Sequence, residues 1–136
     1  MIHVLDAGPM IAYMDGERGA PVVAQILTDN PNACYAHVFN LTEIYYIYFR
    51  RGGVTMAETA IQTLLAAGVI PRDDADEAFW KETGTFKGSH AMSLPDAFCL
   101  ALARRLGGTV ITTVPTDHGE FDPLVQHNYC PTLFIR

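Results

Sequence analysis

Residues 97–112 read Ala-Phe-Cys-Leu-Ala-Leu-Ala-Arg-Arg-Leu-Gly-Gly-Thr-Val-Ile-Thr, and this stretch is the clearest indication of the fold class. Residues 97–106 are apolar on nearly every side before Arg104, which predicts a central helix that is buried over most of its surface. Gly107 and Gly108 end that helix, and residues 109–112 are β-branched, as is typical of a strand. A buried helix followed at once by a strand is typical of chains whose helices pack on a parallel sheet.

The same alternation of strands and helices continues along the rest of the chain. Short apolar or β-branched runs predict strands at residues 2–5, 34–38, 69–70, 109–112 and 132–135. Helical spacing or helix-start residues predict further helices over residues 9–14, 22–27, 41–48, 57–65, 73–82 and 122–126. Residues 84–93 are expected to form a flexible loop. The alternation predicts an α/β fold, a three-layer α/β/α sandwich with helices on both faces of a parallel sheet.

Length and composition fit one globular domain over residues 1–136. The hydrophobic share is 49% and the charged share 18%, as in ordinary folded proteins. No apolar run approaches the roughly 20 residues of a membrane span, and the first residues lack a secretory signal. The three cysteines are scattered, which favours buried thiols in a reducing, cytoplasmic setting. A net charge of −6 does not indicate a basic nucleic-acid surface, although a bound cation would change the local sign.

Four acids follow predicted strands at the positions where α/β proteins bind ligands. Asp6 comes directly after the first strand, and Glu43 lies in the helix that follows the second. Asp96 begins the buried helix, and Asp117 comes shortly after the strand at 109–112. Because ligands bind at the carboxyl ends of parallel strands, we expect the four carboxylates to converge there. Such a group suits Mg²⁺ or Mn²⁺, which would polarise a phosphodiester and help to generate hydroxide.

Each acid also has a purely structural interpretation. Ser93 and Asp96 have the spacing of a helix capping box, and Asn40 and Glu43 share that spacing. Asp117 is equally compatible with a turn, and Asp6 with the start of the helix at 9–14. Capping does not exclude metal binding, so the four acids together carry more weight than any one of them.

Four segments of the sequence, taken in order, resemble those of a known family. The segments are Val-Leu-Asp6-Ala-Gly-Pro, Asn-Leu-Thr-Glu43-Ile, Ser-Leu-Pro-Asp96-Ala-Phe-Cys-Leu-Ala-Leu-Ala and Thr-Asp117-His-Gly-Glu-Phe-Asp122-Pro-Leu. In this order they resemble the PIN domain, and the compact length resembles the VapC-type toxins of toxin–antitoxin pairs. The resemblance implies an endoribonuclease that uses Mg²⁺ or Mn²⁺, a parallel five-stranded sheet, a homodimer and inhibition by a cognate antitoxin.

The sequence departs from the PIN pattern in two places. Gly8 stands where many relatives carry a small hydroxyl or amide residue, so a hydrogen bond near the first acid is expected to be missing. The stretch from Thr112 to Asp117 is longer than the usual step from strand to acid, and Pro115 keeps it extended or turned. Glu120 and Asp122 are therefore alternatives to Asp117 as the fourth acid.

Two other functions fit the same residues. A housekeeping PIN nuclease would process ribosomal or transfer RNA without an antitoxin. A non-catalytic PIN-like scaffold would bind partners or RNA, and the lengthened stretch before Asp117 favours it. Cationic residues for RNA contact are sparse: Lys87 and His90 in the expected loop, and the arginine pairs 50–51 and 104–105 at helix ends.

Overall fold

The computed structural model describes residues 1–113 and 130–135. The strands are β1 (His3–Leu5), β2 (Cys34–His37), β3 (Val69–Arg72), β4 (Thr109–Thr112) and β5 (Thr132–Phe134). The helices are α1 (Ala7–Asp15), α2 (Ala20–Asp29), α3 (Val38–Ala66), α4 (Glu77–Ser89) and α5 (Leu94–Leu106). The predicted helix at 122–126 lies outside the described residues.

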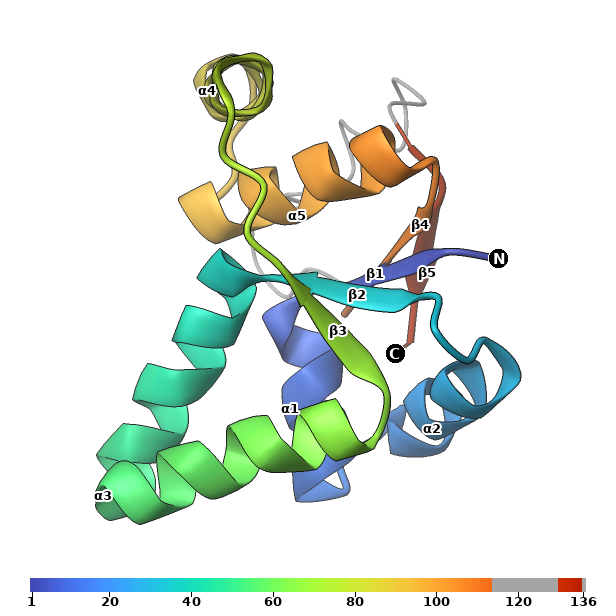
Figure 1. Cartoon of the computed structure of the whole chain (residues 1–136), viewed down its shortest axis with the longest axis vertical. Helices are drawn as coiled ribbons and strands as arrows, with labels where there is room; N and C mark the ends of the chain where they lie inside the picture. Colours follow the sequence, from blue (N-terminus) through green and yellow to red (C-terminus); the bar gives the residue numbers. More distant parts are fainter. Residues whose placement is uncertain (114–129, 136) are drawn as a thin grey trace.

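All five strands form one parallel sheet in the order β3-β2-β1-β4-β5. Figure 1 shows α5, with α4 beyond it, on one face of the sheet and α1, α2 and α3 on the other. The predicted α/β/α sandwich with a five-stranded parallel sheet is thereby confirmed. Strand order reverses between β1 and β4, and the crevice at such a switch point is where open α/β sheets bind ligands.

Alternate residues of the central strands divide between two cores. Leu5 and Ile111 pack with α1, α2 and α3, whereas Val4 and Val110 pack with α4 and α5. Because both faces of the sheet are covered, its central strands are apolar at successive positions instead of alternating with polar residues. Burial on both faces fixes the register, and with it the level at which β1 and β4 end.

Helix α5 is the central buried helix that the sequence predicts. Its buried residues run from Asp96 to Ala103, and Gly107 ends it in the left-handed conformation, with φ at 65°. Ser93 caps its start, since the Ser93 Oγ accepts a hydrogen bond of 3.2 Å from the Asp96 N–H. The predicted capping role of Ser93 is confirmed. No helix in the described part of the chain is long and apolar enough to cross a membrane.

One local prediction is wrong, and two predicted helices are continuous across a kink. Residues 84–93 are not a flexible loop, because α4 continues to Ser89. Phe79, Thr83 and Phe86 are buried along one side of α4, so packing on α5 outweighs the low helix propensity of the glycines in that helix. Helix α3 joins the two predicted helices at 41–48 and 57–65 across a kink at Gly52 and Gly53.

Candidate active site

Three of the four predicted acids meet at the switch point of the sheet. Asp6 follows β1 and caps α1, Glu43 lies in α3, and Asp96 lies in the first turn of α5. Asp6 and Asp96 are buried, with 8% and 9% of their surface exposed, and Glu43 is half-buried. We call Asp6, Glu43 and Asp96 the carboxylate cluster. Asp117 and its alternatives Glu120 and Asp122 lie outside the described residues.

The Asp6 carboxylate is held by hydrogen bonds from three different elements. Its Oδ1 accepts from the Ala7 N–H at 2.8 Å and from the Asn40 Nδ2 at 3.2 Å. Its Oδ2 accepts from the Thr112 Oγ1 at 3.0 Å, across the switch point between β1 and β4. These donors satisfy a buried charge and fix the side chain in one orientation. Asp6 is therefore both a helix cap and an oriented carboxylate at the site.

Asn40 is the site residue that the sequence interpretation missed. Its predicted role at a helix start is wrong, because α3 begins at Val38 with His37 as its N-cap. Asn40 is fully buried, and its Nδ2 donates to Asp6 and, at 3.3 Å, to the Pro95 carbonyl oxygen. It thus joins β1, α3 and the start of α5. The spacing of three residues between Asn40 and Glu43 places both on one side of a helix, which is the signal that predicts a shared site.

The carboxylates of the cluster interact electrostatically. Burial and the charge of Glu43 raise the pKa of Asp6, although its hydrogen bonds act in the opposite direction. Burial and the charge of Asp96 raise the pKa of Glu43 to about 7. All three carboxylates also act on the Cys99 thiol, whose pKa burial raises well above its usual value. Since the charges of all three acids act on one buried thiol, the three carboxylates lie within electrostatic range of the same part of α5.

The donor chemistry of the cluster suits a hard cation. Among residues 1–113 and 130–135, no lysine or arginine forms an ion pair with Asp6 or Glu43. The Asn40 Oδ1 is also buried without a hydrogen-bond partner in that part of the chain. Carboxylate and amide oxygens are the ligands that Mg²⁺ and Mn²⁺ prefer. Negative charge and oxygen donors therefore accumulate here, and no basic side chain of the described residues pairs with Asp6 or Glu43.

The described acids do not by themselves form a complete metal site. Within the two described ranges, no three histidine, cysteine, aspartate or glutamate side chains are arranged to hold a metal ion. The cluster is thus an electrostatically coupled group that is not closed around one point. A further ligand from the predicted fourth acid is consistent with this geometry.

Gly8 has a steric explanation in the structure. A Cβ atom at Gly8 would lie 2.9 Å from both the Cγ2 and the Oγ1 of Thr113. The space that a side chain at position 8 would use is therefore filled by Thr113, from the end of β4. A hydroxyl group does contact the first acid, and it is that of Thr112 in β4.

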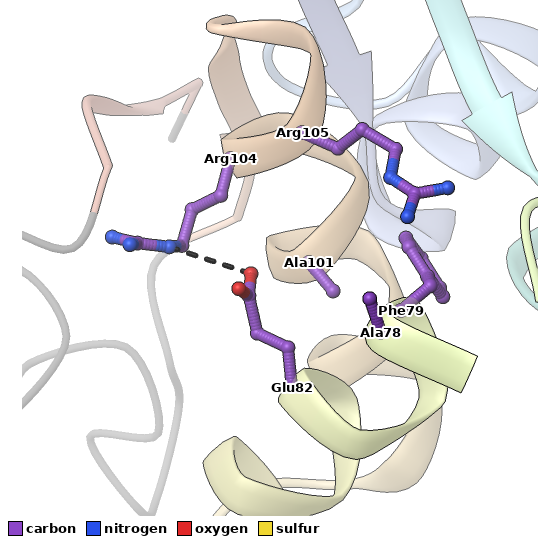
Figure 2. A pocket seen from close by; sticks show the side chains of 6 residues that line it. All are labelled: Ala78, Phe79, Glu82, Ala101, Arg104 and Arg105. Atoms are coloured by element: carbon purple, nitrogen blue, oxygen red, sulfur yellow. Dashed lines mark ion pairs between the residues drawn. The ribbon is translucent and has the colours of Figure 1, made fainter. Parts of the chain in front are cut away.

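The arginines near this end of the sheet are paired with acids. Arg72 contacts Asp74 at 2.8 Å, and Arg105 contacts Asp74 at 3.1 Å and Asp76 at 2.8 Å. We call these four residues the arginine-paired group. A small pocket between α4 and α5 adjoins it, where Arg104 approaches Glu82 at 3.4 Å (Figure 2). This pocket is lined by Ala78, Phe79, Glu82, Ala101, Arg104 and Arg105 and includes no residue of the carboxylate cluster.

Fold and site together define a class of protein: a parallel α/β domain with an acidic site at its topological switch point. The PIN domain sequence family matches residues 3–122 of the chain, so the chain belongs to the PIN domain family. Comparison with curated proteins by sequence gives no significant match.

Solved structures of similar fold include several toxin–antitoxin proteins. DNA-bound VapBC from Salmonella typhimurium is 12% identical, with a TM-score of 0.73 over 100% of this chain and 99% of that one. VapBC-1 from nontypeable Haemophilus influenzae is 16% identical, with a TM-score of 0.71 over 99% and 98%. The sarcin-ricin loop cleaving toxin VapC20 from Mycobacterium tuberculosis is 18% identical, with a TM-score of 0.65 over 90% and 94%. At these identities the likeness concerns the fold.

Proposed function

We propose that this chain is a metal-dependent endoribonuclease that hydrolyses RNA phosphodiester bonds as the toxin of a VapBC-type pair. The observation that carries the proposal is the carboxylate cluster, in which Asp6, Glu43 and Asp96 interact at one site. Among the described residues, no basic side chain forms an ion pair with Asp6 or Glu43. Membership of the PIN family and the similar fold of a toxin that cleaves the sarcin-ricin loop support it.

The carboxylates of Asp6, Glu43, Asp96 and Asp117 would hold a Mg²⁺ or Mn²⁺ ion. When bound, such an ion polarises the scissile phosphodiester and lowers the pKa of water. The fixed hydrogen bonds of Asp6 keep one carboxylate oriented at the centre of the site. Glu43, whose pKa is raised to about 7 in the metal-free protein, would lose its proton as it takes up the ion.

The proposal includes partners. The similar VapBC structures are toxin–antitoxin proteins, and one of them is bound to DNA. We therefore propose a cognate antitoxin for this chain, a homodimer and a cytoplasmic location. Expression tests this part: the chain produced alone should arrest growth, and coexpression of its genomic neighbour should restore it. Normal growth without the neighbour would instead favour a housekeeping nuclease.

Cleavage of RNA by the purified protein tests the chemistry. We expect cleavage of single-stranded or looped RNA with Mg²⁺ or Mn²⁺, none with excess EDTA, and none by the Asp96→Asn variant. Circular dichroism should show that this variant is folded, since the substitution preserves side-chain volume and removes a buried charge. Undiminished cleavage in EDTA would refute the proposal. A folded protein that takes up no Mn²⁺ in a calorimetric titration would favour a non-catalytic scaffold.

A further inference from the structure

An exposed aromatic ring lies beside the carboxylate cluster. Phe39 is in the first turn of α3, one helical turn before Glu43, so the two side chains project from the same side of the helix. Of its surface, 39% is exposed. Its neighbour Asn40 donates to Asp6 and to the Pro95 carbonyl oxygen, one residue before Asp96. Phe39 thus adjoins the residues that hold the cluster together.

The Phe39 ring is supported on one face. It stacks on Phe98 with 4.0 Å between ring centroids and 10° between ring planes. Phe98 is itself buried and fixed by His37 and Phe79, at centroid distances of 4.7 Å and 5.9 Å. Phe98 covers one face of the Phe39 ring and the His37 ring centroid lies 5.8 Å away, while 39% of the residue stays exposed. The result is a flat apolar surface on a rigid support.

A second exposed apolar side chain lies at the start of α5. Leu94 is 43% exposed and lies one turn before Phe98, on the same side of that helix. Figure 1 shows the starts of α3 and α5 next to each other, and the hydrogen bond from Asn40 to Pro95 joins them. We call Phe39 and Leu94, supported by Phe98, the apolar platform.

The charges around the platform make an ionic grip on RNA weak. Arg72 and Arg105 are already paired with Asp74, and the cluster itself repels phosphate until a cation binds. A nucleotide next to the scissile bond therefore needs a contact that does not depend on charge. Stacking of a base on an aromatic ring supplies about 1–3 kcal/mol per base and tolerates any base.

We propose that Phe39 is a stacking residue that holds an unpaired base of the RNA beside the scissile phosphodiester. This inference rests on the proposed nuclease function and assigns the substrate a single-stranded segment at the cleavage point. Phe39 acts on binding and not on the chemical step, because its ring carries no group that transfers a proton or binds a cation.

Substitutions at position 39 separate stacking from packing. Phe39→Leu keeps apolar contact with Phe98 but removes the ring, whereas Phe39→Trp keeps a ring. We expect Phe39→Leu to raise the KM for RNA about tenfold with kcat nearly unchanged, and Phe39→Trp to behave like the parent protein. The matched control is Phe49→Leu, because Phe49 is 48% exposed on the same helix, roughly 15 Å further along it. That control should leave KM unchanged.

A binding measurement gives a readout that is independent of cleavage. In the Asp96→Asn background, which leaves RNA uncut, single-stranded RNA oligonucleotides carry 2-aminopurine at each position in turn. Stacking on Phe39 should quench the fluorescence at one position, and Phe39→Leu should abolish that quenching. Thermal unfolding of each variant serves as the check on folding.

The outcomes distinguish this inference from the proposed function. If the parent protein cleaves RNA and Phe39→Leu matches it in KM and quenching, the stacking role is wrong and the nuclease proposal stands. If the parent protein neither binds nor cleaves any RNA, both are wrong. If Phe39→Leu leaves KM unchanged but shifts the sedimentation of the protein, the ring is a contact between protein chains, and the stacking role is again refuted.

Discussion

Carboxylic acids have opposite properties in the carboxylate cluster and in the arginine-paired group. In the arginine-paired group, contacts with Arg72 and Arg105 lower the pKa of Asp74 to about 2, and Arg105 does the same for Asp76. In the carboxylate cluster, burial and repulsion raise the pKa of Asp6 and bring that of Glu43 to about 7. The difference is the presence or absence of a cationic neighbour.

This contrast separates acids that hold the fold together from acids that are available for chemistry. Asp74 and Asp76 connect β3, α4 and α5 through arginines, so their charges are used within the protein. The charges of the cluster cost free energy in the absence of a cation, and a bound cation would recover it. Carboxylates with raised pKa values at a switch point are therefore candidates for function, whereas the aspartates that pair with arginine have a structural role.

The largest expected effect comes from removing one charge of the carboxylate cluster. Asp6→Asn should lower RNA cleavage by about a thousandfold, the loss that follows removal of one essential electrostatic contact at an active site. The variant should stay folded, because the new amide can donate to the Thr112 hydroxyl, which turns to accept. Cleavage rates with Mg²⁺ and a thermal melt measure both.

The matched control is Asp76→Asn. Asparagine caps helices as well as aspartate does, so α4 should keep its start and cleavage should stay at the parental rate. Comparable loss of activity in both variants would show that the two groups do not differ in function.

The next effect concerns pH and metal together. A folded-state pKa of about 7 for Glu43 means that the folded protein holds a proton that the unfolded chain releases above pH 4.5. Without metal, stability should therefore fall as pH rises from about 4.5 to 7, by about 2 kcal/mol after allowance for solvent around a half-buried group. Mn²⁺ should restore stability at pH 7.5 and have little effect at pH 5.

Glu43→Gln is the control for this prediction. It should reduce the dependence of the melting temperature on pH and weaken the response to Mn²⁺, since glutamine has no proton to lose. Melting curves at pH 5 and pH 7.5, each with and without Mn²⁺, give the comparison. A parent protein whose melting temperature rises steadily between these pH values without metal would contradict the assigned electrostatics of the cluster.

The sequence predicts the fold well because short apolar strands and glycine-terminated helices are local signals. It also predicts that Asp6, Glu43 and Asp96 come together, since the carboxyl ends of parallel strands share one edge. The role of Asn40 is not local: its amide is satisfied by Asp6 and Pro95, 34 and 55 residues away. A search limited to acids omits a buried amide of this kind.

Other features depend on packing that no local pattern contains. The length of α4 is set by the side chains that it buries against α5, and these outweigh the glycines that predict a loop. The arginine-paired group joins residues 29 and 31 positions apart, so the arginines at the end of α5 look in sequence like ordinary helix-end cations. The choice among Asp117, Glu120 and Asp122 as fourth acid stays a prediction.

The smallest expected effect tests the arginine-paired group directly. Arg105→Ala should lower the melting temperature by a few degrees and leave cleavage unchanged, because Arg105 contacts both Asp74 and Asp76 at a partly exposed surface. Arg104→Ala is the matched control, because Arg104 also lies over a phenylalanine ring. Its ion pair with Glu82 is longer, at 3.4 Å, so Arg104→Ala should lower the melting temperature less than Arg105→Ala.

The pH dependence of that small effect distinguishes the two groups. Paired carboxylates with pKa values lowered to about 2 contribute stability above pH 3.8 and lose it as pH falls towards 2. The difference between Arg105→Ala and the parent protein should thus be equal at pH 5 and pH 7.5, the interval over which the Glu43 effect changes. A purely structural ion-pair group contains no group that titrates between pH 5 and pH 7.5. If the stability difference between Arg105→Ala and the parent protein changes over this interval, or if Arg105→Ala loses cleavage, the arginine-paired group is coupled to the carboxylate cluster.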